Sequence, residues 1–535
     1  MTRPRGAAVL ALAGAAALLV SCSGPTAAAG PPLGQRVHVE QGDVVGLDDA
    51  GTLRFQGIPY AAPPVGALRW VAPQPPATWA QPLEATAPGA RCAQLAAPAG
   101  VAHATAASNA EDCLTLNVTT PATTTANSKL PVLVWLHGGG FNAGAGSDTD
   151  PRRLAAAGPL VVVTVNYRLG IFGFLGLPGL ADSGSFGLLD QQAALRWVQR
   201  NIASFGGDPR AVTLAGESAG ADSVCAQLAS PGAAGLVSRA VLQSGGCSGG
   251  NLVDVIRPGT GPLGDTWKPL PLVESAGSTA AGALGCPDPA TALSCLRALP
   301  PDRIVGGAGV YWSPATGTAT LPRRPSDVVA DGGMPPIPVL AGTNRDEGTL
   351  FTSAFFVQPG TPLTDNGFRT LLAAAAGSRS GAAGRAYPVL DRSPDRAWSD
   401  VITDRAYACS GLVTYQRLAG TAPVYAYEFA DPTAPPTFVA PPPDLAGTVT
   451  HAAELAYLFD LVPGQPSLTP AQLATAAQLV GAWARFASTG DPSGDGTMWP
   501  RWSGGGAVWT VTDRGATVVA AGDFAAMHHC EIWGS

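Results

Sequence analysis

A serine at the centre of Gly216-Glu217-Ser218-Ala219-Gly220 is the strongest candidate for a catalytic residue. The pentapeptide follows an apolar run at residues 211–215 and precedes a predicted helix at residues 221–228. A strand that turns directly into a helix forces a tight turn, which presents the central side chain above the sheet. The sequence therefore predicts Ser218 as the nucleophile of an acyl transfer.

A second glycine-rich segment, His137-Gly138-Gly139-Gly140-Phe141, directly follows an apolar run at residues 132–136. Consecutive glycines let the backbone approach a substrate closely and aim its N–H groups at developing negative charge. We expect the N–H groups of Gly139 and Gly140, with that of Ala219, to form an oxyanion hole.

The serine needs a base, and the chain has six histidines. Where the nucleophile is the serine of a Gly-x-Ser-x-Gly turn, the nucleophile comes first in the sequence, followed by the acid and then the base. The base must therefore follow Ser218, which leaves His451, His528 and His529. His451 follows a proline-rich loop after a predicted strand, whereas the other two lie beside Cys530 at the C-terminus, where a disulfide anchor is the simpler interpretation. We predict His451 as the base.

The acid that orients this histidine should follow a strand between Ser218 and His451. Residues 338–340 form such a strand, and Asp346 and Glu347 lie in the turn after it. Either carboxylate could hold the imidazole in the required tautomer and stabilise its cation. The residue pattern alone leaves both candidates open.

Short apolar, β-branched runs alternate with helical stretches, which predicts a largely parallel sheet covered by helices on both faces. One predicted helix covers residues 187–200, and another is capped by Thr469, has Pro470 at its first position and ends at Gly490. Residues 250–335 and 355–400 are rich in proline, glycine and alanine, and we expect them to extend over the sheet within one domain. The candidate strands lie at residues 132–136, 160–165, 211–215, 240–242, 338–340 and 425–429.

The composition excludes some function classes. Only 13% of residues are charged, the net charge is −7, and lysines and arginines form no cluster, so nucleic acid is not an expected partner. Hydrophobic residues make up 46% of the chain, enough for a large core. No Cys-x-x-Cys or Cys/His spacing suggests a metal site. We therefore expect no metal and no cofactor.

The N-terminus has the features of a targeting segment. Arg3 and Arg5 precede an apolar run at residues 7–20, which is short for a membrane span. The run leads to Cys22 after small residues, which resembles a bacterial lipoprotein cleavage site. This pattern predicts a signal peptide at 1–22, a lipid anchor on Cys22, a flexible tether at 23–33 and a catalytic domain at 34–535. The alternative is an ordinary signal peptide cleaved near residues 27–29.

Export would place the other eight cysteines in an oxidising compartment, where an even number fits four disulfides. Their spacing alone leaves the connectivity open.

Several further segments resemble the type-B carboxylesterase family, which includes cholinesterases and some fungal lipases. The similarity extends from about Val37 to Trp533. Besides the sequence around Ser218, it rests on residues 55–60 (FQGIPY), 63–66 (PPVG), 111–118 (EDCLTLNV), 166–170 (NYRLG) and 205–209 (FGGDP).

This resemblance implies an α/β-hydrolase fold and a Ser218–Glu347–His451 triad, since the family's acid is the glutamate of an Asp-Glu-Gly turn. Glu217 and Ser244 match positions that support the triad. The resemblance also implies three disulfides: Cys92–Cys113, Cys286–Cys295 and Cys409–Cys530. It leaves Cys225 and Cys247 unassigned, as a pair or as buried thiols.

The segment between Cys92 and Cys113 contains no aromatic residue. Cholinesterases carry a choline-binding tryptophan there, so we expect no cation–π site at this place. The predicted function is hydrolysis of small to medium esters. The alternatives are a lipase or sterol esterase acting on long acyl chains, and a non-catalytic binding module, which the presence of Ser218 disfavours. The sequence leaves the oligomeric state open.

Overall fold

The structure is a computed structural model that describes residues 1–2, 32–96, 106–248, 255–256, 258–307, 311–390, 392–437, 440–461, 467–494, 496 and 498–534. The predicted signal peptide and Cys22 lie outside the described residues. Of the predicted tether, only Pro32 and Leu33 are described. Both lie on the domain, since Pro32 bridges to Thr125 and the Leu33 N–H donates to the Thr124 carbonyl at 2.8 Å.

A sheet of 11 strands runs through the described part of the chain, in the order β18-β17-β15-β14-β11-β10-β7-β9-β6-β4-β3. The strands from β9 to β17 pair in parallel, and the pairs outside them are antiparallel. The prediction of a largely parallel sheet is therefore confirmed for its centre. The bounds are β3 Leu47–Asp49, β4 Thr52–Pro59, β6 Thr115–Pro121, β7 Leu130–Leu136, β9 Val161–Val165, β10 Gly207–Glu217, β11 Arg239–Gln243, β14 Val339–Asn344, β15 Val424–Phe429, β17 Ala507–Thr512 and β18 Gly515–Ala520.

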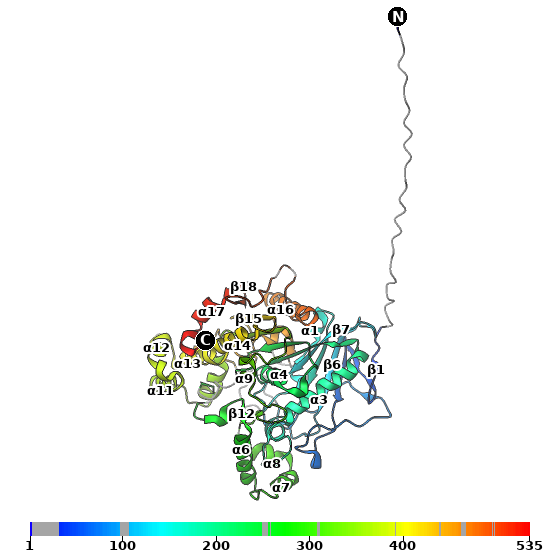
Figure 1. Ribbon diagram of the computed structural model, residues 1–535, viewed down its shortest axis with the longest axis horizontal. Helices are drawn as coiled ribbons and strands as arrows, with labels where there is room; N and C mark the ends of the chain where they lie inside the picture. The colour runs from blue at the N-terminus through cyan, green and yellow to red at the C-terminus, as the bar shows by residue number, and fades with distance from the viewer. Residues whose placement is uncertain are drawn as a thin grey trace.

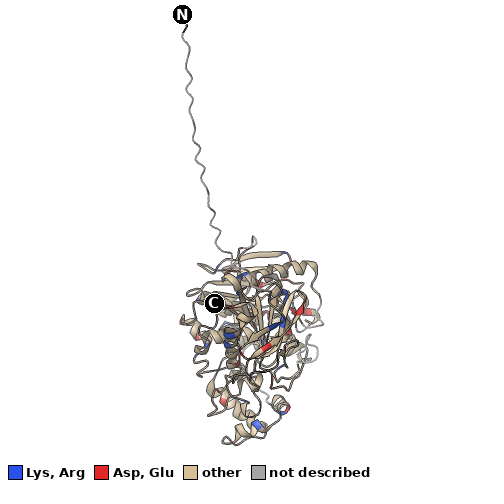
Figure 2. Cartoon of the chain, turned by 90° about the vertical axis from the view of Figure 1, so that its right-hand side faces the viewer, with Lys and Arg blue, Asp and Glu red and all other residues tan. Residues whose placement is uncertain are grey.

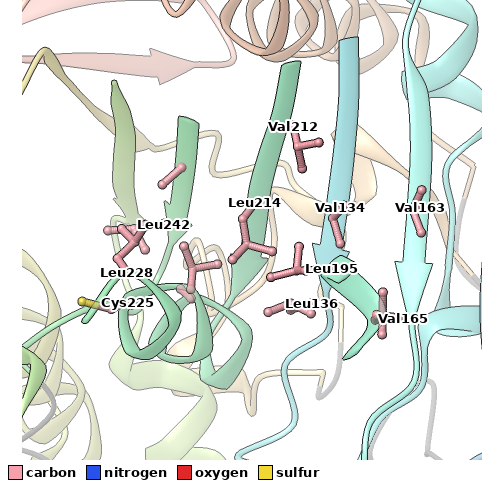
Figure 3. Close-up of a cluster of buried hydrophobic side chains, with 14 of the residues drawn as sticks. Val134, Leu136, Val163, Val165, Leu195, Val212, Leu214, Cys225, Leu228 and Leu242 are labelled. Atoms are coloured by element: carbon pink, nitrogen blue, oxygen red, sulfur yellow. The ribbon is translucent and has the colours of Figure 1, made fainter. Parts of the chain in front are cut away.

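Alternate residues of the central strands face two separate cores, as expected for a sheet buried on both faces. Val134 of β7 packs with Leu195 of α3 (Phe186–Asn201) and Val224 of α4 (Ala219–Ala229) on one face. Trp135, its neighbour in the chain, packs with Trp483 of α16 (Pro470–Thr489) on the other. Figure 3 shows the first core, to which β7, β9, β10, β11, α3 and α4 contribute side chains.

Helix α16 begins and ends where the sequence predicted. The Gln472 N–H donates to Thr469 Oγ1 at 3.3 Å, and the Thr469 N–H donates to Gln472 Oε1 at 2.8 Å. This reciprocal capping satisfies two N–H groups that a helix N-terminus leaves without partners. Gly490 ends the helix with φ 82°, a left-handed conformation that glycine adopts without a steric cost.

The alanine-rich segments extend over the sheet as predicted, mostly as short helices. In Figure 1, α6 (Leu270–Ala283), α7 (Ala292–Ala298) and α8 (Pro301–Gly307) gather at the lower end of the molecule, and α11 (Asp365–Ala376) and α12 (Ser380–Ala386) at its left side.

Four disulfides connect the described cysteines. The three pairs implied by the family resemblance are present, namely Cys92–Cys113, Cys286–Cys295 and Cys409–Cys530. Cys225 and Cys247, which the sequence left unassigned, form the fourth, with Cα atoms 5.3 Å apart. Cys225 lies in α4, so this bond joins the helix behind Ser218 to the loop after β11.

Positions of charged residues are scattered along the backbone in the view of Figure 2. Among the residues that the structure describes, no helix is both long and apolar enough to span a membrane.

Candidate active site

Ser218 lies at the point where β10 ends and α4 begins. Its backbone has φ 55° and ψ −126°, a conformation that costs a non-glycine residue about 1–3 kcal/mol. The Ser218 N–H donates to the Gln243 carbonyl of the neighbouring strand at 2.9 Å, which holds the turn against the sheet. The strained strand–turn–helix geometry predicted for a nucleophile is therefore present.

Two glycines are required by close backbone contacts around this turn. A Cβ on Gly220 would overlap the Leu136 carbonyl at the end of β7. Gly139 has φ 98°, and its carbonyl accepts the N–H groups of Asn142 and Ala143, both at 3.1 Å. The tight turn after β7 can therefore lie directly beside the Ser218 turn.

His451 lies in a loop between β15 and α15 (Leu455–Leu458), and its side chain is buried. Its Nδ1 is 2.6 Å from Glu347 Oε2. The other oxygen of Glu347 accepts hydrogen bonds from Thr343 Oγ1 and the Asn344 N–H, both at 2.7 Å. These bonds fix the carboxylate, so it can hold Nδ1 protonated and leave Nε2 as the basic atom.

Asp346, the other candidate acid, faces away from His451. Its carboxylate accepts hydrogen bonds from Arg396 at 2.7 Å and from the Val449 N–H at 2.9 Å. The structure thus separates two adjacent carboxylates that the residue pattern alone did not distinguish.

The Nε2 atom of His451 lies 3.1 Å from Glu217 Oε1. Neither atom has a hydrogen-bond partner among the described residues. Burial by itself would lower the pKa of His451, but the charges of Glu217 and Glu347 raise it to about 9. Burial raises the pKa of Glu217 to about 8. The two side chains therefore compete for a proton at mildly alkaline pH.

Ser218 and His451 share no hydrogen bond within the described part of the chain. Catalytic hydrogen bonds are often long in unliganded enzymes and tighten when substrate binds. The contact between Ser218 and His451 therefore stays a prediction, as do the roles of the triad residues.

Comparisons with known proteins place this arrangement in a family. A family model described as "Carboxylesterase family" matches residues 34–533. The chain is 35% identical over 490 residues to a para-nitrobenzyl esterase of Bacillus subtilis (strain 168), covering 87% of this chain and 92% of that protein. This chain belongs to the carboxylesterase family.

Two other proteins support the same assignment. A phenmedipham hydrolase of Pseudarthrobacter oxydans is 34% identical, covering 92% of this chain and 98% of its own. The crystal structure of a Geobacillus stearothermophilus carboxylesterase aligns with a TM-score of 0.78 at 31% identity, covering 93% of this chain and all of that one. The predicted α/β-hydrolase fold and ester hydrolase activity are therefore confirmed.

A cleft above Ser218 gives this carboxylesterase room for a substrate. About 810 Å³ of space not filled by protein atoms, part of it open to solvent, lies between its walls. Gly140 and Ala219, two of the three predicted oxyanion donors, line it together with Ser218. Gly139 is not among the residues that line the cleft, although it directly precedes Gly140.

Two aromatic residues that the sequence analysis missed cover His451. The ring centroids of Phe351 and Tyr407 lie 5.0 Å and 5.4 Å from that of the imidazole, and both residues line the cleft. They lie in short helical segments, Gly348–Thr352 and Thr403–Ala408, that carry no recognisable motif. These rings shield the histidine from solvent, so the charges of Glu217 and Glu347 act on it with little screening.

A buried polar network lies beside the triad. Glu454 accepts hydrogen bonds from Gln243 at 3.1 Å and from Asn344 at 2.6 Å. Ser244, predicted as a supporting residue, lines the cleft with φ 49°, and its buried hydroxyl has no partner among the described residues. No sequence motif indicates Glu454, because its partners come from strands far away in the chain.

Proposed function

We propose that this carboxylesterase hydrolyses small to medium esters through a covalent intermediate on Ser218, with His451 as the base and Glu347 as its orienting acid. The observation that carries the proposal is the buried His451 imidazole. Its Nδ1 is held at 2.6 Å by Glu347, while its Nε2 forms no hydrogen bond in the described structure and lies 3.1 Å from Glu217 Oε1. A general base in this fold needs one oriented nitrogen and a second nitrogen that can take up a proton.

The reaction proceeds in two acyl-transfer steps. Ser218 Oγ attacks the ester carbonyl carbon as its proton passes to His451 Nε2. The tetrahedral intermediate collapses, and the alcohol leaves with that proton. Water then attacks the acyl-enzyme, again giving a proton to His451, and the carboxylic acid leaves with Ser218 Oγ protonated.

The oxyanion of each tetrahedral intermediate would be held by the N–H groups of Gly139, Gly140 and Ala219. None of the hydrogen bonds among the described residues engages these three N–H groups. Ala219 is the first residue of α4, where a helix N–H points outward and the helix dipole favours negative charge. Donors fixed before substrate arrives are typically worth about 3–4 kcal/mol each in the transition state.

Glu217 sets the pH at which this chemistry can run. A negatively charged Glu217 beside Nε2 stabilises the imidazolium, which cannot accept the proton of Ser218. Because Glu217 takes up a proton in nearly the same pH range as His451, the pair acts as one titrating unit. We expect hydrolysis to accelerate as the pH rises from 6 to 9.

The substitution Ser218→Ala tests the proposal with p-nitrophenyl acetate as substrate. We expect kcat to fall by at least about 10⁴-fold with the fold retained in circular dichroism. Ser278→Ala is the matched control, because Ser278 is exposed and its hydroxyl bonds only the Glu274 carbonyl within its own helix. Substantial turnover by Ser218→Ala would contradict the proposal.

A panel of p-nitrophenyl esters distinguishes the proposed substrates from those of a lipase. We expect kcat/KM to be highest for acyl chains of about two to six carbons, because the bounded cleft limits the size of the acyl group. A rise in activity for chains of 16 carbons at an oil–water interface would favour the lipase alternative.

We also propose that the protein is exported and anchored by a lipid on Cys22. The support is the sequence pattern of a charged start, an apolar run and a cysteine after small residues. Expression of the full chain in a bacterium with labelled palmitate should label the wild type and leave Cys22→Ala unlabelled. A wild-type protein that enters the medium without label would contradict the anchor.

A further inference from the structure

The cleft above Ser218 carries one charged side chain among the described residues that line it, and this is Asp222. No lysine or arginine is among these described lining residues. Asp222 lies in α4 four residues after Ser218, so the two residues share a face of the helix, one turn apart. Among the described residues of the cleft wall, a substrate held at Ser218 therefore meets a carboxyl group and no lysine or arginine side chain.

Asp222 is half-buried and has few partners that would stabilise its charge. Its Oδ1 accepts the Gly246 N–H at 2.9 Å. No lysine or arginine forms an ion pair with it in the described structure. Burial raises the pKa of Asp222 to about 7, although the Gly246 N–H and the charge of His451 act in the opposite direction. A cation brought by a ligand would stabilise the carboxylate further.

Aromatic rings line the same cleft. Phe351 and Tyr407 stack with their ring centroids 5.9 Å apart, and both face the cleft beside Asp222. The faces of aromatic rings attract cations. Tyr311 also lines the cleft, but the ammonium group of Lys268 already lies 4.6 Å from its ring centre. Phe351 and Tyr407, together with Tyr415, thus bring further aromatic rings to the cleft that contains Asp222.

We propose that Asp222 makes this cleft selective for esters that carry a cationic group near the reacting carbonyl, and that it disfavours anionic esters. The inference rests on the proposed function, in which Ser218 attacks an ester bound in this cleft. The proposed role of Asp222 in selectivity differs from a purely structural role, in which Asp222 only holds the loop at Gly246. The structural role needs an acceptor atom, whereas the selectivity needs a negative charge.

Asp222→Asn separates the two roles, because asparagine keeps an oxygen acceptor for the Gly246 N–H and removes the charge. The first probe is p-nitrophenyl 4-(trimethylammonio)butyrate, compared with its neutral carbon isostere, p-nitrophenyl 5,5-dimethylhexanoate. A second pair moves the charge to the alcohol side: 2-(trimethylammonio)ethyl acetate and 3,3-dimethylbutyl acetate. Assays run at pH 8.5, where Asp222 is ionised.

We expect the ratio of kcat/KM for the cationic ester to that for its isostere to fall about 10-fold in Asp222→Asn, for at least one pair. A ratio that stays within about twofold for both pairs would overturn the inference. If Asp222→Asn does not fold, the relative rates at which the wild type hydrolyses anionic and neutral esters test the inference. Mono-p-nitrophenyl glutarate should be hydrolysed more slowly than the neutral ester, and an equal or faster rate would overturn the inference.

The neutral isosteres distinguish a failure of the proposed selectivity from a failure of the proposed function. Turnover of the isosteres without a charge-dependent ratio would refute the selectivity alone. If neither isostere is hydrolysed and Ser218 resists a fluorophosphonate, the proposed function fails, and the inference fails with it.

Discussion

Two buried histidines of this enzyme each lie between two carboxyl groups, yet their surroundings differ. His451 lies between Glu347 and Glu217. His528, near the C-terminus, has Nδ1 2.7 Å from Asp404 Oδ1 and Nε2 3.4 Å from Glu428 Oε1. In both cases the neighbouring carboxylates outweigh the effect of burial and raise the pKa of the histidine to about 9.

The difference lies in what surrounds the carboxylates. At His528 each one has a second partner: Arg345 donates to both oxygens of Glu428, at 3.2 and 2.7 Å, and the Tyr387 hydroxyl donates to Asp404 Oδ2 at 2.7 Å. At His451, the Glu217 oxygen nearest Nε2 has no hydrogen-bond partner among the described residues. A satisfied network favours stability, whereas an unsatisfied one leaves a group free to react.

The sharpest test of this comparison replaces each histidine by glutamine. We expect His451→Gln to lower kcat by about 10⁴-fold, because no other group can take the proton of Ser218. His528→Gln should keep kcat within about 10-fold of the wild type. Steady-state hydrolysis of p-nitrophenyl acetate by both variants measures this, and comparable losses would remove the distinction between the two sites.

Substitution of the two adjacent carboxylates, Asp346 and Glu347, should give the next largest difference in activity. Glu347→Gln should lower kcat by about 10³–10⁴-fold, because an amide cannot stabilise the imidazolium and favours the wrong tautomer. Asp346→Asn keeps an acceptor for Arg396 and the Val449 N–H, so we expect a loss below about 10-fold. If Asp346→Asn proves the more damaging, the assignment of the acid is wrong.

For stability, in contrast to activity, we expect substitution of His528 to have a larger effect than substitution of His451. His528→Gln should lower the free energy of unfolding by about 3 kcal/mol, because it removes a cation from two buried carboxylates. Since the pKa of His528 is raised above its ordinary value, its stabilisation is complete below about pH 6.5 and is lost as the pH rises through about 9. Urea unfolding at pH 6 and pH 9 tests this, and an equal effect at both pH values would contradict it.

The smallest expected effect concerns the pH dependence of hydrolysis. Glu217→Gln removes a negative charge beside His451 Nε2, so the neutral, basic form of the histidine should persist to lower pH. We expect the acidic limb of the kcat/KM profile to shift by about one pH unit toward acid. An unchanged limb, or a shift toward alkaline pH, would show that Glu217 does not act on His451 through its charge.

The sequence predicted the elements whose signals are local. The nucleophile turn depends on glycines next to Ser218, and α16 on the capping residues Thr469 and Gly490, so each could be identified from a few neighbouring letters. The choice of Glu347 over Asp346 needed the family resemblance, because the direction of each carboxylate depends on distant partners such as Arg396.

The wall of the cleft could not be predicted in the same way. Phe351, Tyr407 and Asp222 reach the cleft from separate segments that only tertiary packing brings together. Asp222 lies two residues beyond the recognised pentapeptide, and its position in the cleft was not evident without the loop at Gly246. The Cys225–Cys247 bond likewise depends on how α4 packs beside the loop after β11.

The most direct test of the account is the site of covalent labelling by a fluorophosphonate, located by mass spectrometry of peptides from the inactivated enzyme. The account predicts one phosphonyl group per chain on the peptide that contains Ser218, and none in His451→Gln over the same time. Labelling of another cleft serine, such as Ser244 or Ser410, or no labelling of an enzyme that still hydrolyses esters, would contradict it.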